Sequence, residues 1–251
     1  MATTALDSPA ASHHKPAVKQ HLKLALYDDP HSEFSSKVKV ALYAKGLEWT
    51  PLAVPCGGGT RSPEFLAVNP LGKIPALLVT DEQGRREAVV ESEVIVEFLE
   101  DAFPGHPRLL PEEPLERSRA RLIARLHDLY LEPALRRLYP QVAPSTRSEA
   151  VVQEAAAAFR ARLAELDALL PPNRQLAVTH NQLTVADCGY PALLLYGELI
   201  LPAVGQPPLQ ESYTPRLAAW RRALWAQPAV ARVLSSLQPA AQEWLDGKLR
   251  Q

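Results

Sequence analysis

Cysteine is scarce in this sequence: its 251 residues include 2, Cys56 and Cys188. The two lie far apart and form no C-x-x-C pair, which excludes a zinc-binding cysteine cluster and a disulfide framework. A reducing compartment fits this cysteine usage. We expect Cys188 to be buried in a helix and Cys56 to be an incidental thiol in a loop.

The net charge of the chain is close to zero, and the chain has no long apolar run. Lys and Arg number 27 and Asp and Glu number 28, a formal charge of −1, which offers no attraction to nucleic acid or to an acidic membrane surface. No stretch approaches the roughly 18 consecutive apolar residues of a membrane span, and residues 1–20 are small, polar and without a signal-peptide core. We therefore expect a cytoplasmic protein with a disordered tail at 1–20 and with neither nucleic acid nor membrane as partner.

Glycine is scarce at 11 residues, and its positions exclude a phosphate-binding loop. Gly72-Lys73 is followed by Ile74 rather than by Ser or Thr, and Ala67 stands where the first glycine of such a loop would be. Proline, in contrast, is abundant at 24 residues, and 47% of the chain is hydrophobic. This composition predicts two modest domains made of short elements that prolines separate.

The hydropathy pattern predicts a different architecture for each domain. Residues 21–103 carry strand and helix patterns in the order β-α-β-α-β-β-α, which is the order of a thioredoxin-like domain. Four prolines mark a linker at 104–113, and residues 114–251 show only helical periodicity. We therefore predict an α+β protein whose second domain is all-α. The helices of that domain are expected at about 115–139, 146–170, 184–201, 214–226 and 228–246.

Capping residues predict where several helices begin. Ser35 or Ser36 is expected to cap the first helix, and Ser92 is expected to cap the helix that ends the first domain. Thr184 and Asp187, three residues apart, resemble a capping box with Asp in place of Glu. We therefore expect a structural role for that last pair.

Pro75 stands where a strand should begin, although proline supplies no backbone donor there. A cis bond between Ile74 and Pro75 would account for this position. The bend would also turn the main chain of Ile74 outward, where it could pair with an extended peptide. We therefore predict a cis Ile74-Pro75 bond beside a peptide-binding site.

Three motifs in a fixed order resemble the soluble glutathione transferases. Residues 69–77 read Asn-Pro-Leu-Gly-Lys-Ile-Pro-Ala-Leu and are followed by Glu91-Ser92, which together look like the glutathione-binding half of that family. Residues 32–42 are similar to the serine-type active-site segment of the zeta and theta classes, in which a serine lies five residues before a basic residue, as Ser32 does before Lys37 here. The resemblance covers about residues 22–235 and implies a two-domain transferase fold and a homodimer.

The resemblance implies glutathione as co-substrate, no metal, and a catalytic role for Ser32, whose hydroxyl would donate a hydrogen bond to the glutathione thiolate. Ser92 at a helix start would bind the γ-glutamyl carboxylate, Glu91 the amine and Lys73 the glycyl carboxylate. Each assignment has an alternative. Ser32 could be a serine that caps its own turn, and Glu91 with Ser92 could be an ordinary helix cap. Lys73 could be a solvated surface lysine. The expected glutathione-binding residues are Phe34, Lys73, Ile74, Pro75, Glu91 and Ser92.

The second substrate is expected to lie between the two domains. Arginines at positions 117, 121 and 125 share one helix face, which could attract an anionic substrate or could simply be solvated. The residues expected to line the second-substrate site are His127, Tyr130 and Tyr190.

The expected reaction is attack of the glutathione thiolate on an electrophilic small molecule. Serine rather than cysteine at position 32 argues against thiol reductase activity. Two alternatives stay open: a glutathione-dependent isomerase of the maleylacetoacetate type or a dehalogenase, and a non-catalytic module that uses the same fold for binding or assembly.

Overall fold

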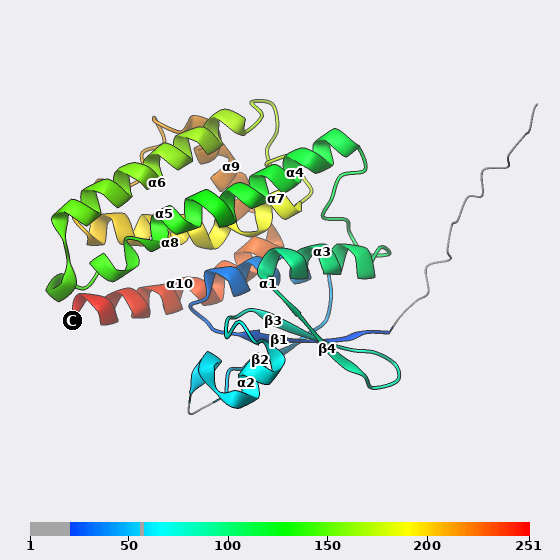
Figure 1. The fold of residues 1–251 in the computed structure, drawn as a ribbon. Coiled ribbons are helices and arrows are strands. Elements are labelled where there is room, and N and C mark those ends of the chain that lie inside the picture. Colours follow the sequence, from blue (N-terminus) through cyan, green and yellow to red (C-terminus); the bar gives the residue numbers. More distant parts are fainter. Residues whose placement is uncertain (1–20, 56–57) are drawn as a thin grey trace, which may run out of the picture.

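We analysed a computed structural model of the chain, which describes residues 21–55 and 58–251. The predicted tail at 1–20 and the Cys56 thiol lie outside the described residues. Figure 1 shows a small sheet with three helices and, next to it, a larger body made of helices. The order of elements confirms the predicted combination of a thioredoxin-like domain and an all-α domain.

The first domain is built on a four-stranded sheet of order β2-β1-β3-β4. Strand β1 pairs in parallel with β2 and antiparallel with β3, and β3 pairs antiparallel with β4. This is the predicted β-α-β-α-β-β-α order. Its elements are β1 (Lys23–Asp28), α1 (Glu33–Ala44), β2 (Thr50–Ala53), a 3₁₀ turn (Gly59–Arg61), α2 (Pro63–Val68), β3 (Ala76–Thr80), β4 (Arg86–Val90) and α3 (Ser92–Ala102).

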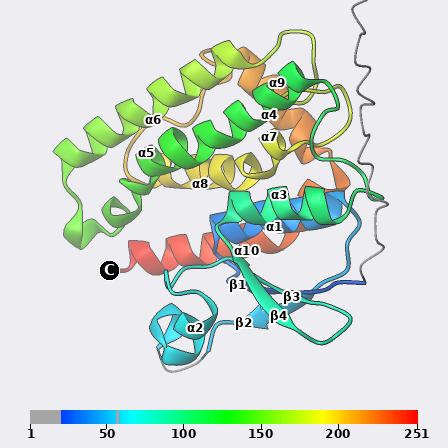
Figure 2. The ribbon, with the colours of Figure 1, turned by 45° about the vertical axis from the view of Figure 1, so that its right-hand side comes forward.

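The alternating leucines of the first strand explain which face of the sheet is buried. Leu24 pairs with Val79 and Leu26 with Leu77, and all four side chains are buried. Side chains two apart in a strand point to the same face, so these residues form one apolar layer. Figures 1 and 2 place α1 and α3 between the sheet and the helical domain, and α2 on the opposite face of the sheet.

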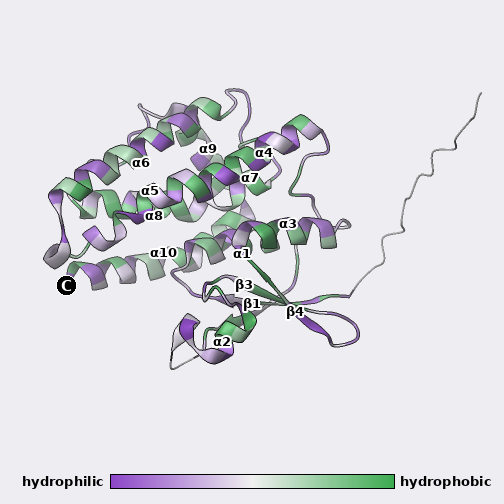
Figure 3. Cartoon of the chain, in the orientation of Figure 1, coloured by the Kyte–Doolittle hydropathy of each residue, from purple (hydrophilic) through white to green (hydrophobic). Residues whose placement is uncertain are grey.

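Residues 114–251, all of which the structure describes, contain helices joined by turns and loops and no strand. Both apolar and polar residues occur along α4, α6 and α10 in Figure 3, as expected for helices that bury one face. Helices α8 and α10 pack against α1 of the first domain. The elements are α4 (Pro114–Leu126), a π-helical segment (His127–Leu131), α5 (Glu132–Arg136), 3₁₀ turns (Tyr139–Gln141, Pro144–Thr146), α6 (Glu149–Leu169), α7 (Val185–Cys188), α8 (Tyr190–Ala203), α9 (Pro215–Trp225) and α10 (Pro228–Leu249).

Two of the predicted helices are not continuous. The helix predicted at 115–139 is divided by the π-helical segment at His127–Leu131, and the one predicted at 184–201 is interrupted at Gly189. A Cβ atom at position 189 would lie 2.8 Å from the ring of His127. The two irregularities therefore meet at one point, where the backbone of Gly189 rests on the His127 side chain.

Two of the three capping predictions were wrong. Helix α1 begins earlier than expected, because the Ser32 N–H donates to Asp29 O at 3.0 Å and the Ser32 Oγ accepts from Ser35 N–H at 3.1 Å. Ser35 and Ser36 are buried inside that helix rather than at its start. The N-cap of α3 is Glu91, and Ser92 is the first helical residue.

The capping box at Thr184 and Asp187 was predicted correctly. The buried Asp187 carboxylate accepts hydrogen bonds from the Thr184 N–H at 2.8 Å, from the Ala177 N–H at 3.1 Å and from the Trp220 indole N–H at 2.8 Å. It therefore joins three segments of the helical domain. Cys188, next to it, is buried as expected, and burial raises the pKa of its thiol far above the usual range.

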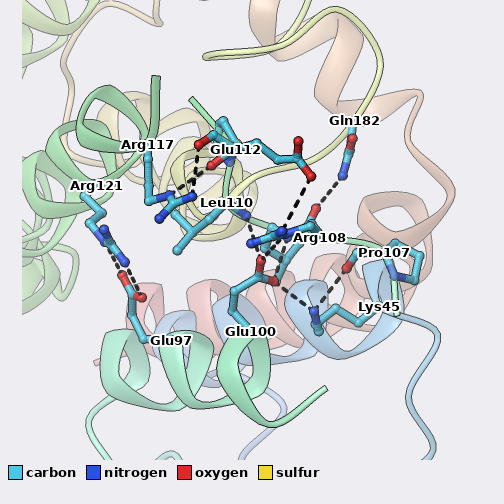
Figure 4. A network of polar contacts seen from close by, with 12 residues as sticks. Lys45, Glu97, Glu100, Pro107, Arg108, Leu110, Glu112, Arg117, Arg121 and Gln182 are labelled. Atoms are coloured by element: carbon cyan, nitrogen blue, oxygen red, sulfur yellow. Dashed lines mark hydrogen bonds and ion pairs between the residues drawn. The ribbon is translucent and has the colours of Figure 1, made fainter. Parts of the chain in front are cut away.

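A buried ion pair anchors the chain between α3 and α4 to the end of α1 (Figure 4). Lys45 Nζ lies 2.8 Å from Glu100 Oε2 and donates to Pro107 O at 3.1 Å. The same carboxylate accepts from the Leu109 N–H at 2.8 Å. Residues 103–113 contain no helix or strand, and this network fixes their path between the two domains.

The arginine face of α4 is engaged by neighbouring protein groups. Arg121 makes a two-pronged pair with Glu97 of α3, at 2.7 and 2.9 Å, and Arg117 donates to Pro111 O at 2.9 Å. Both are visible in Figure 4. These contacts favour the interpretation of this face as an exposed surface rather than as a substrate site.

Candidate active site

The sheet topology brings the three sequence motifs to one end of the sheet. Tyr27 near the carboxyl end of β1 pairs with Ala76 at the amino end of β3, and Ala76 pairs with Val90 at the carboxyl end of β4. The loop before α1, the Ile74-Pro75 pair and the Glu91-Ser92 pair continue directly from these positions. The Ile74-Pro75 bond is cis, as predicted.

A cavity of about 960 Å³ opens at this end, between the two domains. Its volume is at the upper end of the range usual for small-molecule sites. The first domain contributes His31, Ser32, Glu33, Phe34, Thr60, Gly72, Lys73 and Ile74 to its wall. The helical domain contributes Asp128, Glu132, Pro133, Arg136, Arg137 and Tyr139.

Ser32 combines a capping role with a free donor. Its oxygen accepts from the Ser35 N–H, and a hydroxyl that accepts one hydrogen bond still has its own hydrogen to donate. It also stands at the N-terminus of the 12-residue helix α1, where partial positive charge favours an anion. The turn-capping alternative and the donor role are therefore compatible at this residue.

A tight turn holds Lys73 and Ile74 on the cavity wall. The Asn69 side chain donates to Lys73 O at 2.7 Å and accepts from the Leu71 N–H at 3.0 Å. Gly72 has a φ of +60°, and a Cβ there would lie 2.8 Å from Arg61 Nη1 and 2.9 Å from Thr60 O. Only glycine fits this position without displacing the turn.

Replacing Gly72 with alanine is expected to lower the free energy of unfolding by about 2–3 kcal/mol, because a positive φ costs an L residue roughly 1–2 kcal/mol and a backbone contact is added. Urea unfolding measures the change. Gly84→Ala is the matched control: its φ is +78°, but a Cβ there meets nothing within 4 Å. Equal losses in both variants would show that the contact with Thr60 is unimportant.

Glu91 and Ser92 lie at the correct end of the sheet but are not among the residues that line this cavity. Ser92 is buried and Glu91 is exposed. Glu91 has a φ of 69° and is, within residues 21–55 and 58–251, the one non-glycine residue with a positive φ. Such backbone strain is concentrated at functional sites. Because neither Glu91 nor Ser92 lines the cavity, their role in binding glutathione stays a prediction.

The three residues expected to line the second-substrate site are not on the wall of this cavity. His127 and Tyr190 are fully buried, and the Tyr190 hydroxyl donates to Ile123 O at 2.7 Å. Tyr130 is 48% exposed on another face. The π-helical turn explains the difference, because it changes which side chains point inward along His127–Leu131.

The helical wall of the cavity consists of residues that the sequence prediction missed. Asp128, Glu132 and Arg136 follow at intervals of four, a spacing that places side chains on one helix face and could have been recognised. Arg136 pairs with Glu132 and lies over the rings of Phe34 and Tyr139, at 6.0 and 5.5 Å from their centroids. Burial raises the pKa of the Glu132 carboxyl, although Arg136 opposes this.

Within residues 21–55 and 58–251, no group of three or more His, Cys, Asp and Glu side chains is placed to hold a metal ion. Over the same part of the chain, each helix is too short or too polar to cross a membrane.

The fold and the cavity define a two-domain protein in which a thioredoxin-like domain and a helical domain both line one cavity. Similarity to known proteins identifies its family. Residues 26–107 match the family "Glutathione S-transferase, N-terminal domain". A probable glutathione S-transferase of Zea mays is 32% identical over 225 residues, which is 84% of this chain and 90% of that protein. The chain therefore belongs to the glutathione S-transferase family of enzymes.

Two further relatives are informative. The structure of rice GST1 in complex with glutathione is similar with a TM-score of 0.75 and 28% identity, over 92% of this chain and 98% of that one. A maleylacetoacetate isomerase of Pseudomonas aeruginosa is 39% identical over 113 residues, which is 44% of this chain and 51% of the isomerase. The match to the isomerase thus spans about half of each protein.

Proposed function

We propose that this protein activates the thiol of glutathione for attack on an electrophilic small molecule, with Ser32 as the catalytic residue. The observation that carries the proposal is the position of Ser32 at the N-terminus of α1, on the cavity wall, where its oxygen accepts from the Ser35 N–H. A hydroxyl that accepts one hydrogen bond can still donate its own hydrogen. The family membership agrees with it. The thiolate would form beside Ser32, and the second substrate would lie against the helical wall.

The energies are adequate for this role. A free thiol has a pKa of about 8.5 and is mostly protonated at pH 7. Lowering that pKa by about two units requires roughly 2.7 kcal/mol of stabilisation of the thiolate. A hydrogen bond to a charged group supplies about 1.5–3 kcal/mol, and the helix N-terminus adds about 0.3–1 kcal/mol.

The remaining contacts to glutathione follow the sheet. Ile74 would pair its main chain with the cysteinyl part, next to Pro75 and opposite Phe34. Lys73 would meet the glycyl carboxylate from the turn before β3. Ser92, at the start of α3, would bind the γ-glutamyl carboxylate, and the adjacent Glu91 would bind the amine.

An isomerase that uses glutathione catalytically is the second candidate, supported by the 39% identity to the Pseudomonas aeruginosa maleylacetoacetate isomerase. In that reaction the same thiolate would add to a maleyl double bond and leave again after rotation. A dehalogenase and a non-catalytic module are further alternatives with no comparable support in the structure.

Retention on immobilised glutathione, followed by assays with a panel of electrophiles and maleyl substrates, tests the proposal. We expect retention, elution by free glutathione, and conjugation of at least one electrophile. Turnover of maleyl substrates without net consumption of glutathione would establish the isomerase instead. Absence of binding and of any turnover would leave the non-catalytic module.

The protein is proposed to act in the cytoplasm as a homodimer. Val94 of α3 and Leu122 of α4 are 55% and 47% exposed, and these helices lie next to each other. Light scattering on the eluted protein measures the mass. A monomer at micromolar concentration would contradict this assembly.

Replacing Ser92 with alanine is expected to raise the KM for glutathione several-fold and to leave kcat almost unchanged. The contact with the γ-glutamyl carboxylate is the same before and during the reaction, so its loss weakens binding without raising the barrier from the bound state. Initial rates over a range of glutathione concentrations measure both constants. An unchanged KM would remove Ser92 from the binding site.

A further inference from the structure

Three side chains of the helical domain hold the loop that carries Ser32. The Tyr196 hydroxyl donates to His31 O at 2.6 Å, before the serine. The Tyr139 hydroxyl donates to Glu33 Oε2 at 3.3 Å, and His127 Nε2 lies 3.1 Å from Glu33 Oε1, both after the serine. Ser32 is thus flanked on both sides by residues that the other domain fixes.

Glu33 is an unusual residue for this place, because it is 4% exposed and directly follows the predicted catalytic serine. A buried carboxylate is costly unless a cation or hydrogen-bond donors lie beside it. The Tyr139 hydroxyl donates to Oε2, and the His127 ring lies beside Oε1. Burial and the Glu33 charge raise the pKa of Tyr139, so its hydroxyl keeps the proton that it donates.

The two ring nitrogens of His127 each face a carboxylate, and the contact with Glu33 is an ion pair without hydrogen-bond geometry. Its Nδ1 lies 2.7 Å from Asp128 Oδ1 while Nε2 faces Glu33. A protonated, charged ring is attracted to both carboxylates, whereas a neutral ring carries a proton on one nitrogen only. The ring is packed edge-to-face against Phe34 of α1 and Tyr190 of α8, with centroids 5.9 and 5.3 Å away.

The charged groups around His127 form a connected set. Lys37 of α1 contacts Asp128 at 3.0 Å and Glu93 of α3 at 2.5 Å, and is itself buried. Burial alone lowers the pKa of His127, but the hydrogen bond to Asp128 and the charge of Glu33 outweigh it and raise the pKa, with Lys37 opposing them. The two carboxylates beside the ring and the direction of the pKa shift both favour the imidazolium form of His127.

We propose that Glu33 and His127 are positioning residues of the active site, an ion pair between the domains that fixes the Ser32 hydroxyl toward the thiol of glutathione. The inference rests on the proposed function. The pair acts through the first turn of α1: Glu33 is the first helical residue, so its restraint fixes the backbone that presents the adjacent serine.

The pair also predicts a pH dependence. The contacts with Asp128 and Glu33 raise the pKa of His127 above its ordinary value, so the imidazolium persists to a higher pH than in a free histidine and is lost as the pH rises through that raised pKa. Activity should therefore rise with pH as the thiol ionises and fall at higher pH as His127 loses its proton. Without the pair, the descending limb should disappear or move.

The test compares Glu33→Gln, His127→Gln and the double variant with the wild type. Both substitutions keep a polar side chain of similar length but remove the charge. We expect each to lower kcat about tenfold at pH 7, because a small displacement of a catalytic group is costly, and to raise the thiolate pKa of bound glutathione while its KM changes less than twofold. The double variant should be no worse than the single ones, since the residues act as one pair.

Lys45→Met is the matched control, because it removes another buried ion pair of α1 at the opposite end of the helix. It should lower the melting temperature while kcat and the thiolate titration stay unchanged at a temperature where the protein is folded. If Glu33→Gln and His127→Gln behave like this control, the pair is only structural and the inference is wrong.

Two further results keep the test decisive. If His127→Gln does not fold, the inference is tested with Glu33→Gln and with the pH profile of the wild type. A wild-type profile without a descending limb contradicts the inference. A descending limb that is unchanged in Glu33→Gln contradicts it as well. If the wild type neither binds nor uses glutathione, the proposed function itself has failed, which is a different outcome from a functional wild type with unaffected variants.

Discussion

Replacing Ser32 with alanine is expected to lower the rate of thiol transfer by up to about a hundredfold at pH 6.5–7, with glutathione affinity nearly intact. The limit follows from the hydrogen bond to the thiolate, worth about 1.5–3 kcal/mol, at about 1.4 kcal/mol for each factor of ten. The loss should shrink at high pH, because the bound thiol then ionises without help. Titration of thiolate absorbance in the glutathione complex measures the shift directly.

This substitution also removes the N-cap of α1, which by itself costs about 0.5–2 kcal/mol of stability. Ser62→Ala separates the two effects, since Ser62 is buried, caps α2 and accepts from the Phe65 N–H at 3.2 Å. It should lose similar stability and keep its activity. Identical thiolate titrations in wild type and Ser32→Ala would show that another donor activates the thiol.

Replacing Lys45 with methionine is expected to lower the free energy of unfolding by about 3–5 kcal/mol at pH 7, because it leaves the buried Glu100 carboxylate without its cation. Arg121→Gln, which breaks the exposed pair with Glu97, should cost less than about 1 kcal/mol. Urea unfolding of both variants tests the contrast. Equal, small losses would mean that the Lys45–Glu100 pair does not hold the interdomain segment.

The pH dependence of this loss has a definite sign. Burial alone would raise the pKa of Glu100, but the Leu109 N–H and Lys45 outweigh it and hold the pKa below its usual value. A depressed carboxyl pKa contributes stability that is present above the unfolded pKa and is lost as the pH falls through the folded one. Without Lys45 that contribution is reduced, so the variant and the wild type should become more similar in stability as the medium is acidified.

The sequence was sufficient for the parts of the structure that follow local rules. The alternation of Leu24 and Leu26 located the first strand, and Pro75 in an apolar run pointed to the cis bond. The segments around Ser32, Ile74 and Glu91 were recognised as glutathione-binding motifs because these motifs are defined by residue types at fixed spacings in the sequence. Their meeting at one end of the sheet then follows from the strand order.

The helical wall depended on tertiary contacts that leave little local trace. Nothing in residues 127–131 distinguishes a π-helical turn from an α-helical one, and that turn decides that His127 points inward and Tyr130 outward. The start of α1 was placed too late because three serines compete for the cap, and the loop geometry before the helix selects Ser32. Glu33 resembled an ordinary polar residue of a first helical turn until Tyr139 and His127 were found beside it.

The contact between Trp220 and Asp187 gives the protein an intrinsic optical probe. Of the 4 tryptophans in the sequence, Trp49 alone belongs to the thioredoxin-like domain, while Trp220, Trp225 and Trp244 belong to the helical one. The Trp220 indole donates to a buried carboxylate and packs 4.7 Å from the Tyr190 ring, so its emission will change when the helical domain opens. Tryptophan fluorescence and glutathione binding can be measured at the same steps of an unfolding experiment. Comparison of the two curves can therefore show whether the two domains unfold together or one before the other.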